Sequence, residues 1–459
     1  MSTGDHTNVK TVFYLVLLCM VFGVAVMSYR GLGRPNYVTS LSSGTDLVQV
    51  AINPQSIANV NTTASCRRPP KHFPTPVAFL HKLQPALEPS CDKLFDGQHS
   101  ERQRVRNAQK HFQLPSDAEI LKAYSKGNCS FVQNDFDNNF YVSPDEIDFP
   151  IAYEMLIYYQ KNRFLQALNL LKFIYRPHNV YCIHIDKGSP QWWINGVKGF
   201  TSCLPNVFVA KKLVKIYYGS VSILDAHLSC LSELLTVTTP WKYVLTLHSP
   251  EIPLITNRDI VKKLVELKGH NIVTKGFNAS DPKSGYAYNW LMAKKVVPGS
   301  PPGKVGPLPN FPIYKSAESI NSALSRDFVK YALTDSKSIA LRKRLEYTQS
   351  AEEFFFDTLN MLKDAPGNFM KLKAAGLKLP RFSRRLWAHM LENGDCIDRN
   401  IRHNICIVSA SDLPFIMKEM KTGLWFYNKY LIDYDHVVND CIQLLLIQNN
   451  FKRYKQDCY

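Results

Sequence analysis

Two adjacent acids, Glu352 and Glu353, are the strongest candidates for catalysis in this chain of 459 residues. They follow Ser350 and Ala351 and precede three phenylalanines, a pattern typical of a first helical turn with Ser350 as the N-cap. A carboxylate at such a place could act as a general base that removes a proton from an attacking hydroxyl. The helix dipole alone also favours acids in a first turn, so a purely structural role stays open.

A second candidate site is Asp186-Lys187-Gly188, which directly follows the apolar run 181–185. An earlier apolar run, 149–159, also has the length of a strand, and 164–174 carries apolar residues at helical spacing. The three segments predict a βαβ unit with parallel, neighbouring strands. Ligands of such sheets bind beyond the carboxyl ends of the strands, where Asp186 is expected. His184 lies inside the second strand and is expected to be a hydrogen-bonded core histidine.

The sequence does not favour a metal site. The usual Asp-x-Asp signature after a central strand is missing, because the stretch 247–251 holds only one acid, Glu251. Asp433-Tyr434-Asp435 and Asp135-Phe136-Asp137 fit the pattern, but neither ends an expected core strand, and such short matches are common by chance. There is no Cys-x-x-Cys and no zinc-spaced Cys/His cluster. We therefore expect no metal ion.

The elements that must position these residues alternate along the chain. Further helices are expected at 192–200, 222–235 and 257–267, the last with Asn257 as N-cap, and strands at 207–210 and 241–247. This alternation predicts a doubly wound α/β fold with a mostly parallel sheet. A loop rich in Gly, Pro, Lys and Ser is expected at 276–312. Beyond it we expect a strand and a helix within 319–333, a helix at 351–362, a strand at 405–408 and a helix at 437–446.

The N-terminus predicts a membrane anchor. Residues 11–29 form an uncharged, largely apolar run of about the ~20 residues that cross a bilayer as a helix. We expect a cytoplasmic tail at 1–10, a transmembrane signal-anchor at 11–29, a proline-containing stem at 30–88 and a lumenal domain at 89–459. A cleaved signal peptide is the alternative, because Ala25-Val26-Met27 weakly resembles a cleavage site.

Charge and cysteine content narrow the class of protein. The formal net charge of +17 would suit nucleic acid, an anionic membrane or an anionic small substrate. Since the basic residues are scattered and no nucleic-acid motif is present, we do not expect nucleic-acid binding. Without Cys19 of the apolar run, ten of the eleven cysteines remain, an even number. Together with glycosylation motifs at Asn61, Asn128 and Asn278, they indicate a lumenal domain with disulfides.

Several sequence blocks resemble the core 2 and I-branching β-1,6-N-acetylglucosaminyltransferases, in order and at nearly their spacing. These blocks are 149–153, 181–187, 203–210, 228–230, 241–243 and 253–264, and the resemblance extends from about Cys91 to the C-terminus. It implies a GT-A-like fold and a Golgi type II membrane protein with a single span. It also implies inverting, metal-independent transfer of N-acetylglucosamine from UDP-GlcNAc, in β-1,6 linkage, to an O-glycan or related glycan or glycoprotein acceptor.

The resemblance assigns Glu353 as the catalytic base and leaves Glu352 as a solvated neighbour. Ala351 replaces a family proline but keeps the acid in register. In the family an Arg and a Lys hold the diphosphate, and Lys429 matches the Lys. The Arg should lie three residues before Cys406, where this chain has His403, with Arg402 one place earlier. Either a shift of one residue brings Arg402 into place, or the diphosphate site is weakened, because imidazole is only partly charged.

The remaining contacts implied by the resemblance concern the nucleoside and the disulfides. Nucleoside contacts map to Leu156, Ile157, Tyr158, Asp186, Lys187, Gly188 and Tyr218. Without the resemblance, Tyr158 and Tyr218 would be taken as core aromatics near strand ends. The implied disulfides join Cys91 to Cys441, Cys129 to Cys203, Cys182 to Cys230 and Cys396 to Cys406, which leaves Cys66 and Cys458. Sequence alone does not determine such pairings.

The acceptor side departs most from the family. Val273 stands where the family has a Glu that contacts the acceptor sugar, and 276–312 replaces a basic aromatic segment. Two alternatives therefore stay open. One is another donor such as UDP-xylose, since the peptide O-xylosyltransferases share the architecture. The other is an inactive lumenal protein that binds a glycan or a nucleotide, which the changes at His403 and Val273 would allow.

Overall fold

The computed structural model describes residues 89–110, 113–136, 142–279, 309–316, 320–346, 348–392 and 395–458. The expected tail, signal-anchor and stem lie outside these ranges, together with Asn61 and Cys66. Most of the loop expected at 276–312 lies outside them as well. All described residues belong to one unit. Within the described ranges, no helix combines the length and hydropathy that a membrane span requires.

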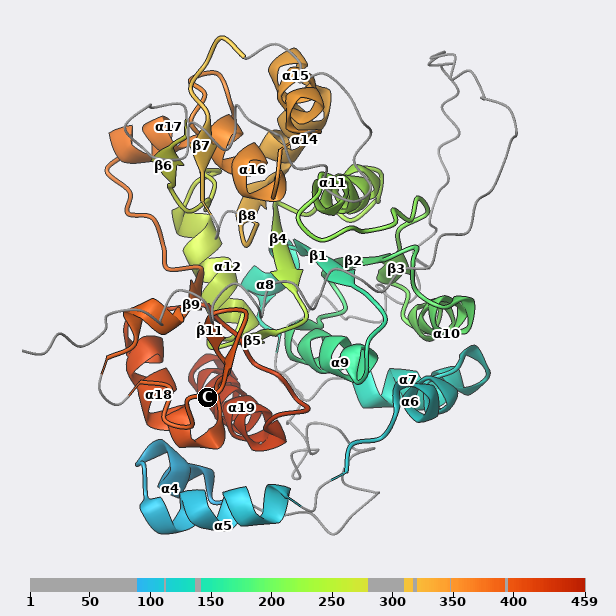
Figure 1. Cartoon of the computed structure of the whole chain (residues 1–459), viewed down its shortest axis with the longest axis vertical. Helices are drawn as coiled ribbons and strands as arrows, with labels where there is room; N and C mark the ends of the chain where they lie inside the picture. Colours follow the sequence, from blue (N-terminus) through green and yellow to red (C-terminus); the bar gives the residue numbers. More distant parts are fainter. Residues whose placement is uncertain are drawn as a thin grey trace, which may run out of the picture. The chain divides into compact units, whose positions relative to one another are not determined.

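A five-stranded sheet with the order β3-β2-β1-β4-β8 lies at the centre of this unit (Figure 1). Its strands are β1 (Ile151–Ile157), β2 (Val180–Ile185), β3 (Val207–Val209), β4 (Tyr243–His248) and β8 (Ala323–Ser325). β1 pairs in parallel with β2 and β4, β2 pairs in parallel with β3, and β8 runs antiparallel to β4. The prediction of an α/β fold with a mostly parallel sheet is confirmed.

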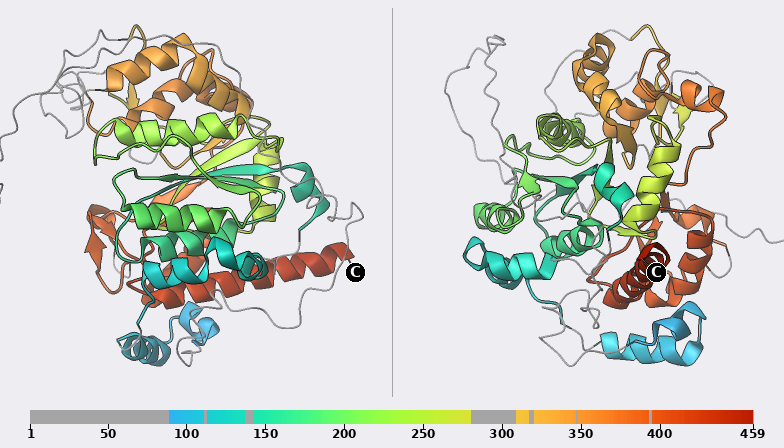
Figure 2. Two further views of the ribbon diagram at one scale, coloured as in Figure 1. Left: turned by 90° about the vertical axis from the view of Figure 1, so that its right-hand side faces the viewer. Right: turned by 180° about the vertical axis from the view of Figure 1, so that it is seen from behind.

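Helices cover both faces of the sheet (Figure 2). On one face lie α9 (Arg163–Ile174) and α10 (Gln191–Thr201), with α19 (His436–Cys458) beyond them. On the other lies α11 (Ser222–Leu234), with α14 (Arg326–Thr334), α15 (Ser336–Leu345) and α16 (Glu352–Asn360) beyond it. Successive side chains of a strand point to opposite faces. Tyr153 and Met155 accordingly join the hydrophobic core on the side of α9, and Ala152 joins the core on the side of α11.

A second, three-stranded sheet adjoins the carboxyl end of β4. It consists of β5 (Glu251–Pro253), β12 (Phe426–Asn428) and β9 (Ser383–Arg385), with β12 in the middle. The two-stranded sheets are β10 (Ile401–Arg402) with β11 (Ile405–Cys406), and β6 (Phe277–Asn278) with β7 (Tyr314–Lys315). β6 therefore corrects the start of the expected loop, because its backbone pairs with a strand beyond the gap.

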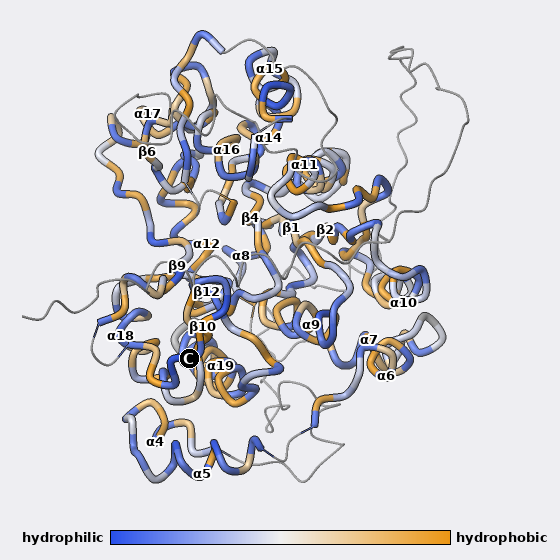
Figure 3. The backbone as a smooth tube through the Cα atoms, in the orientation of Figure 1, coloured by the Kyte–Doolittle hydropathy of each residue, from blue (hydrophilic) through white to orange (hydrophobic). Residues whose placement is uncertain are grey.

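The remaining helices lie around these sheets. They are α4 (Cys91–Phe95), α5 (His99–Gln109), α6 (Asp117–Ala123), α7 (Cys129–Phe136), α8 (Pro144–Asp148), α12 (Asn257–Glu266), α17 (Phe369–Ala374) and α18 (Leu413–Lys421). Short 3₁₀ turns occupy Lys126–Asn128, Ala388–Met390 and Ala410–Asp412. Helix α5 is coloured mostly as hydrophilic (Figure 3), which fits its six exposed positions among eleven residues.

Two predicted N-caps are wrong, because long-range hydrogen bonds use those residues differently. The cap of α12 is Thr256, whose Oγ1 accepts from the backbone N–H of Asp259 at 3.2 Å. Asn257 is instead buried, and its amide donates to Glu146 Oε1 at 2.7 Å. At α16 the cap position is Ala351, without a side-chain cap bond. Ser350 has a φ of 56°, and its N–H donates to the carbonyl of Gly219 at 2.9 Å.

The four disulfides implied by the family resemblance are present: Cys91–Cys441, Cys129–Cys203, Cys182–Cys230 and Cys396–Cys406. Cys182–Cys230 joins β2 to α11, and Cys91–Cys441 joins α4 to α19. The side chain of Cys458 lies outside the described part.

Candidate active site

Asp186 lies at the carboxyl edge of the parallel strands, as the βαβ prediction requires. Its Oδ1 accepts from the backbone N–H groups of Gly188 at 2.9 Å and Ile216 at 2.8 Å. Its own N–H donates to the carbonyl of Ile157, the last residue of β1. These bonds hold the carboxylate at the rim of the sheet and orient the turn that follows β2. Lys187 and Gly188 are exposed there.

The loop 211–221 links this rim to the predicted catalytic helix. It bonds to the end of β2 through Val214, whose N–H donates to Nε2 of the buried His184 at 2.9 Å. Farther along the loop, the Gly219 carbonyl accepts from Ser350, two residues before α16. The loop thus contacts Asp186 through Ile216 and the start of α16 through Gly219, the residue after Tyr218. It also confirms the interpretation of His184 as a core histidine.

The aromatic residues predicted to contact the nucleoside are exposed rather than part of the core. The exposed fraction is 89% for Tyr218 and 46% for Tyr158. The guanidinium of Arg163, at the start of α9, lies 5.6 Å from the ring centre of Tyr158. Leu156 and Ile157, by contrast, are buried within β1. Only backbone groups of those two residues can therefore reach a ligand at the rim.

Glu353 and Glu352 have very different surroundings at the start of α16. Glu353 is partly exposed, and its Oε2 lies 3.2 Å from Nζ of Lys315 on β7. The expectation that Glu352 is a solvated neighbour is wrong, because Glu352 is 6% exposed. Burial raises the pKa of Glu352 to about 7, and the adjacent charge of Glu353 adds to the rise. Of the two acids, Glu353 is therefore the one that a substrate hydroxyl can approach.

A cluster of cations surrounds Lys429, which directly follows β12. Burial lowers the pKa of Lys429 to about 8, and the nearby charges of Arg163, Arg385 and Arg402 lower it further. Within the described part of the chain, the side chains of Lys429 and Arg402 form no ion pair. The N–H of Tyr430 donates to the carbonyl of Pro250 at 2.9 Å, so the cluster lies beside the end of β4. An anionic ligand would relieve the mutual repulsion of these four cations.

Of the two residues considered for the family's Arg, Arg402 is the one within electrostatic range of Lys429. Arg402 is on β10 and lies opposite Ile405, and the disulfide-bonded Cys406 follows. His403 lies in the intervening turn with a φ of 53°, and it is exposed. Of the two, Arg402 is therefore the one whose charge acts on Lys429.

The sequence interpretation missed Arg385 and Arg163, the other two members of the cluster. Arg163 follows β1 by a few residues, and Arg385 ends β9. The sequence did contain a signal for Arg385. Adjacent residues of a strand face opposite sides, so one arginine of the pair Arg384-Arg385 had to point toward the site side of its strand. For Arg163 it was the position just beyond the carboxyl end of a parallel strand, where ligands bind.

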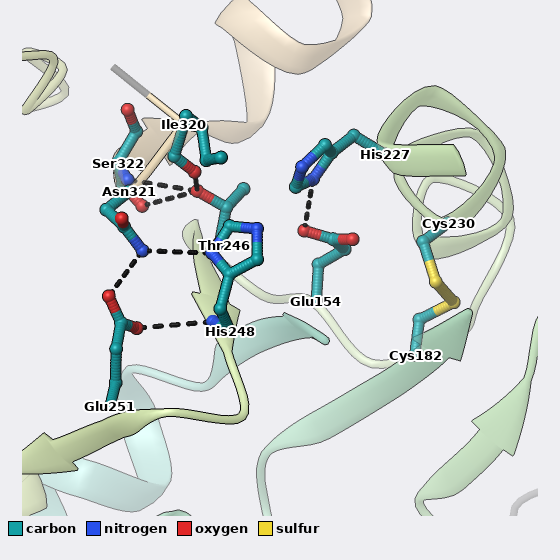
Figure 4. Close-up of polar contacts among 10 residues, drawn as sticks. All are labelled: Glu154, Cys182, His227, Cys230, Thr246, His248, Glu251, Ile320, Asn321 and Ser322. Carbon is teal, nitrogen blue, oxygen red and sulfur yellow. Dashed lines mark hydrogen bonds and ion pairs between the residues drawn. A yellow bond between two sulfur atoms is a disulfide. The ribbon is translucent and has the colours of Figure 1, made fainter. Parts of the chain in front are cut away.

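Buried polar side chains of β1, α11 and the end of β4 contact one another (Figure 4). His227 Nδ1 on α11 is 2.8 Å from Glu154 Oε2 on β1, and both side chains are fully buried. The ring of His227 lies 5.5 Å from that of His248 at the end of β4. Asn321 contacts His248 Nδ1 at 3.3 Å and donates to Glu251 Oε1 at 2.5 Å. Burial raises the pKa of Glu251 to about 7.

The remaining residues that the sequence analysis singled out are Val273, the two Asp-x-Asp matches and the glycosylation motifs. Val273 is fully buried, so its side chain offers no contact to an acceptor. Asp135 forms an ion pair with Lys172, and Asp435 accepts from the N–H of Ala410. Among the described residues, no group of three or more metal-binding side chains is present. Asn128 is exposed, and Asn278 is partly buried on β6.

The chain is similar to enzymes that transfer N-acetylglucosamine. It is 30% identical to the N-acetyllactosaminide β-1,6-N-acetylglucosaminyl-transferase of Mus musculus, over 66% of this chain and 74% of the relative. It is 32% identical to β-1,3-galactosyl-O-glycosyl-glycoprotein β-1,6-N-acetylglucosaminyltransferase 3 of Homo sapiens, over 67% of this chain and 69% of the relative. It is 27% identical to β-1,3-galactosyl-O-glycosyl-glycoprotein β-1,6-N-acetylglucosaminyltransferase 4 of Danio rerio, over 79% of this chain and 85% of the relative.

The sequence profile of the Core-2/I-branching enzyme family matches residues 151–414. This range includes β1, Asp186, the start of α16 and Arg402, and it ends before Lys429. The chain is thus a glycosyltransferase that belongs to the Core-2/I-branching enzyme family.

Proposed function

We propose that this protein transfers N-acetylglucosamine from UDP-GlcNAc to a hydroxyl of an O-glycan or related acceptor, in β-1,6 linkage and without a metal ion. The observation that carries the proposal is that strand pairing places Lys429, Arg385 and the hairpin of Arg402 side by side near the end of β4, where the charges of Arg163, Arg385 and Arg402 act on Lys429. Fixed cations can neutralise the charge that develops on a leaving diphosphate, which is the task of a metal ion in other enzymes.

The geometry suggests a role for each end of the site. The uridine would lie near Asp186 and Tyr218, and the diphosphate on Lys429 and Arg402. Glu353 would remove the proton of the acceptor hydroxyl while the oxygen of that hydroxyl forms a bond to the anomeric carbon of the donor sugar. The bond from that carbon to the diphosphate oxygen breaks at the same time, and UDP leaves with the bonding electrons. Attack from the opposite face inverts the anomeric configuration.

The proposed location is the Golgi lumen, on a single-pass type II anchor at 11–29. Support comes from the four disulfides, which require an oxidising compartment, and from the length of the N-terminal apolar run. A donor such as UDP-xylose would use the same diphosphate cluster, so only turnover distinguishes the sugars.

The test measures UDP release by the full-length protein from a panel of UDP-sugars and glycan acceptors, with EDTA present. We expect turnover with UDP-GlcNAc and a loss of about 100-fold or more in kcat for Glu353→Gln. Glu352→Gln is the matched control. Because Glu352 is 6% exposed and cannot meet the acceptor, that variant should retain turnover.

Each alternative predicts a different result. Loss of activity with EDTA would refute the metal-free mechanism, and turnover with UDP-xylose alone would replace the donor. UDP binding without turnover of any donor would identify a binding protein. Equal activity of Glu353→Gln and wild type would remove Glu353 as the base.

A further inference from the structure

Arg385 lies between the two segments that carry Lys429 and Arg402. In the pairing of β9 with β12, Arg385 is opposite Asn428, the residue before Lys429. The next residue, Leu386, accepts at its carbonyl from the N–H of Cys406, on the strand paired with β10. The segment Arg385-Leu386 therefore pairs on one side with β12, which Lys429 follows, and on the other side with the β10–β11 hairpin, which carries Arg402. Both placements rest on main-chain hydrogen bonds and not on side-chain conformation.

The neighbouring Arg384 faces the other way. Its guanidinium donates to Glu419 Oε1 on α18 at 2.6 Å and lies 5.6 Å from the ring centre of Phe415. Glu419 also accepts from Arg381, at 2.8 Å. Arg384 therefore forms an ion pair with α18. The two adjacent arginines of one strand provide a matched pair of positions, one toward the site and one away from it.

The guanidinium of Arg385 is held by Asn321. Its Nη2 donates to Asn321 Oδ1, and the amide of Asn321 donates to the buried Glu251. Asn321 is itself 1% exposed. It lies beside the end of β4, because its amide contacts His248, the last residue of that strand. A guanidinium has five N–H donors and can hold a side-chain amide and phosphate oxygens together. Arg385 is partly buried, so a ligand at the cluster can reach it.

We propose that Arg385 binds the donor diphosphate together with Lys429 and Arg402, and that Asn321 orients its guanidinium toward the phosphates. This inference rests on the proposed function. It adds a second guanidinium, besides that of Arg402, that can bind phosphate oxygens in a planar, bidentate way. Asn321 is a positioning residue in this scheme, since it acts through Arg385.

The test measures binding of UDP and of uridine to the full-length protein by isothermal titration calorimetry. Arg385→Gln should weaken UDP binding by about tenfold or more, because a charge-assisted phosphate contact is lost, and should change uridine binding by less than about twofold. Arg385→Lys keeps the charge but not the planar fork, so its UDP affinity should be intermediate. Arg384→Gln should leave both affinities within about twofold of wild type.

The outcomes separate this inference from the proposed function. UDP affinity of Arg385→Gln equal to that of wild type would overturn the inference alone. Equal losses for UDP and uridine would also overturn it, because Arg385 would then act through the fold. If wild type bound neither UDP nor UDP-GlcNAc, the proposed function and the inference would both fail. Arg385→Lys keeps the test decisive if Arg385→Gln does not fold.

Discussion

At the scale of single residues, the proposed site depends on the positive charge of Lys429, which burial and neighbouring cations make less favourable. Burial and three neighbouring guanidinium groups lower its pKa to about 8 in the free protein. Below that pH the ammonium is present and attracts a diphosphate, and above it the neutral amine does not. A bound anion favours the charged form, so binding and protonation are linked. This linkage makes affinity for UDP dependent on pH in the range where arginine does not titrate.

We therefore predict that UDP binding weakens by about tenfold between pH 7 and pH 9, as Lys429 loses its proton. Lys429→Arg should remove most of this dependence, because a guanidinium stays charged throughout the range. Calorimetric titrations of both proteins at several pH values provide the measurement. A wild-type affinity that is constant over the range would show that the charge of Lys429 does not contribute to binding.

At the scale of elements, α11 is fastened to the sheet by one covalent and one polar contact. The Cys182–Cys230 disulfide joins it to β2, and the Glu154–His227 pair joins it to β1 (Figure 4). An acid inside an apolar strand is costly, and burial raises the pKa of Glu154. The hydrogen bond between Glu154 Oε2 and His227 Nδ1 offsets part of this cost. Removal of one partner alone should therefore cost more than replacement of both.

We predict that His227→Leu lowers the free energy of unfolding by about 3 kcal/mol, because it leaves the carboxyl of Glu154 buried without its partner. Adding Glu154→Leu should restore part of that loss. Urea unfolding of the two single variants and the double variant, evaluated as a double-mutant cycle, measures the coupling. If the double variant is less stable by the sum of the two single losses, the partners are not coupled.

At the scale of the whole molecule, the disulfides differ greatly in the length of chain they close. Cys91–Cys441 spans 350 residues, and Cys396–Cys406 spans ten. The longer bond connects helices from opposite ends of the described chain, α4 and α19. In the chain-entropy account, closure of a longer loop restricts the unfolded state more strongly. The long-range bond should therefore stabilise the domain more than the local one.

We predict that replacing Cys91 and Cys441 by Ser destabilises the protein by about 3 kcal/mol more than replacing Cys396 and Cys406. Chemical denaturation of both double variants under non-reducing conditions compares them. Similar unfolding midpoints for the two variants would show that local strain or packing, rather than loop length, governs their contributions.

Sequence by itself determined the order of elements and the edge of the sheet at which the site lies. Apolar runs and helical spacing predicted β1, α9 and β2, since these patterns depend on residues close in sequence. Family resemblance supplied the disulfide pairs, which the structure confirms, and the choice of Glu353 as the base, which stays a prediction. Element ends were less secure, as Thr256 and Ser350 illustrate, because hydrogen bonds from distant segments decided them.

Only the tertiary structure decided which cations meet. Arg163, Arg385, Arg402 and Lys429 come from four segments, and strand pairing and turn geometry bring them together. The burial of Glu352 beside the accessible Glu353 likewise depends on packing around α16. Local sequence shows which residues are charged and which side chains of a strand point to the same face. The face that each residue presents, and the charge that it meets there, depend on partners hundreds of residues away, and these partners are assembled only in the fold.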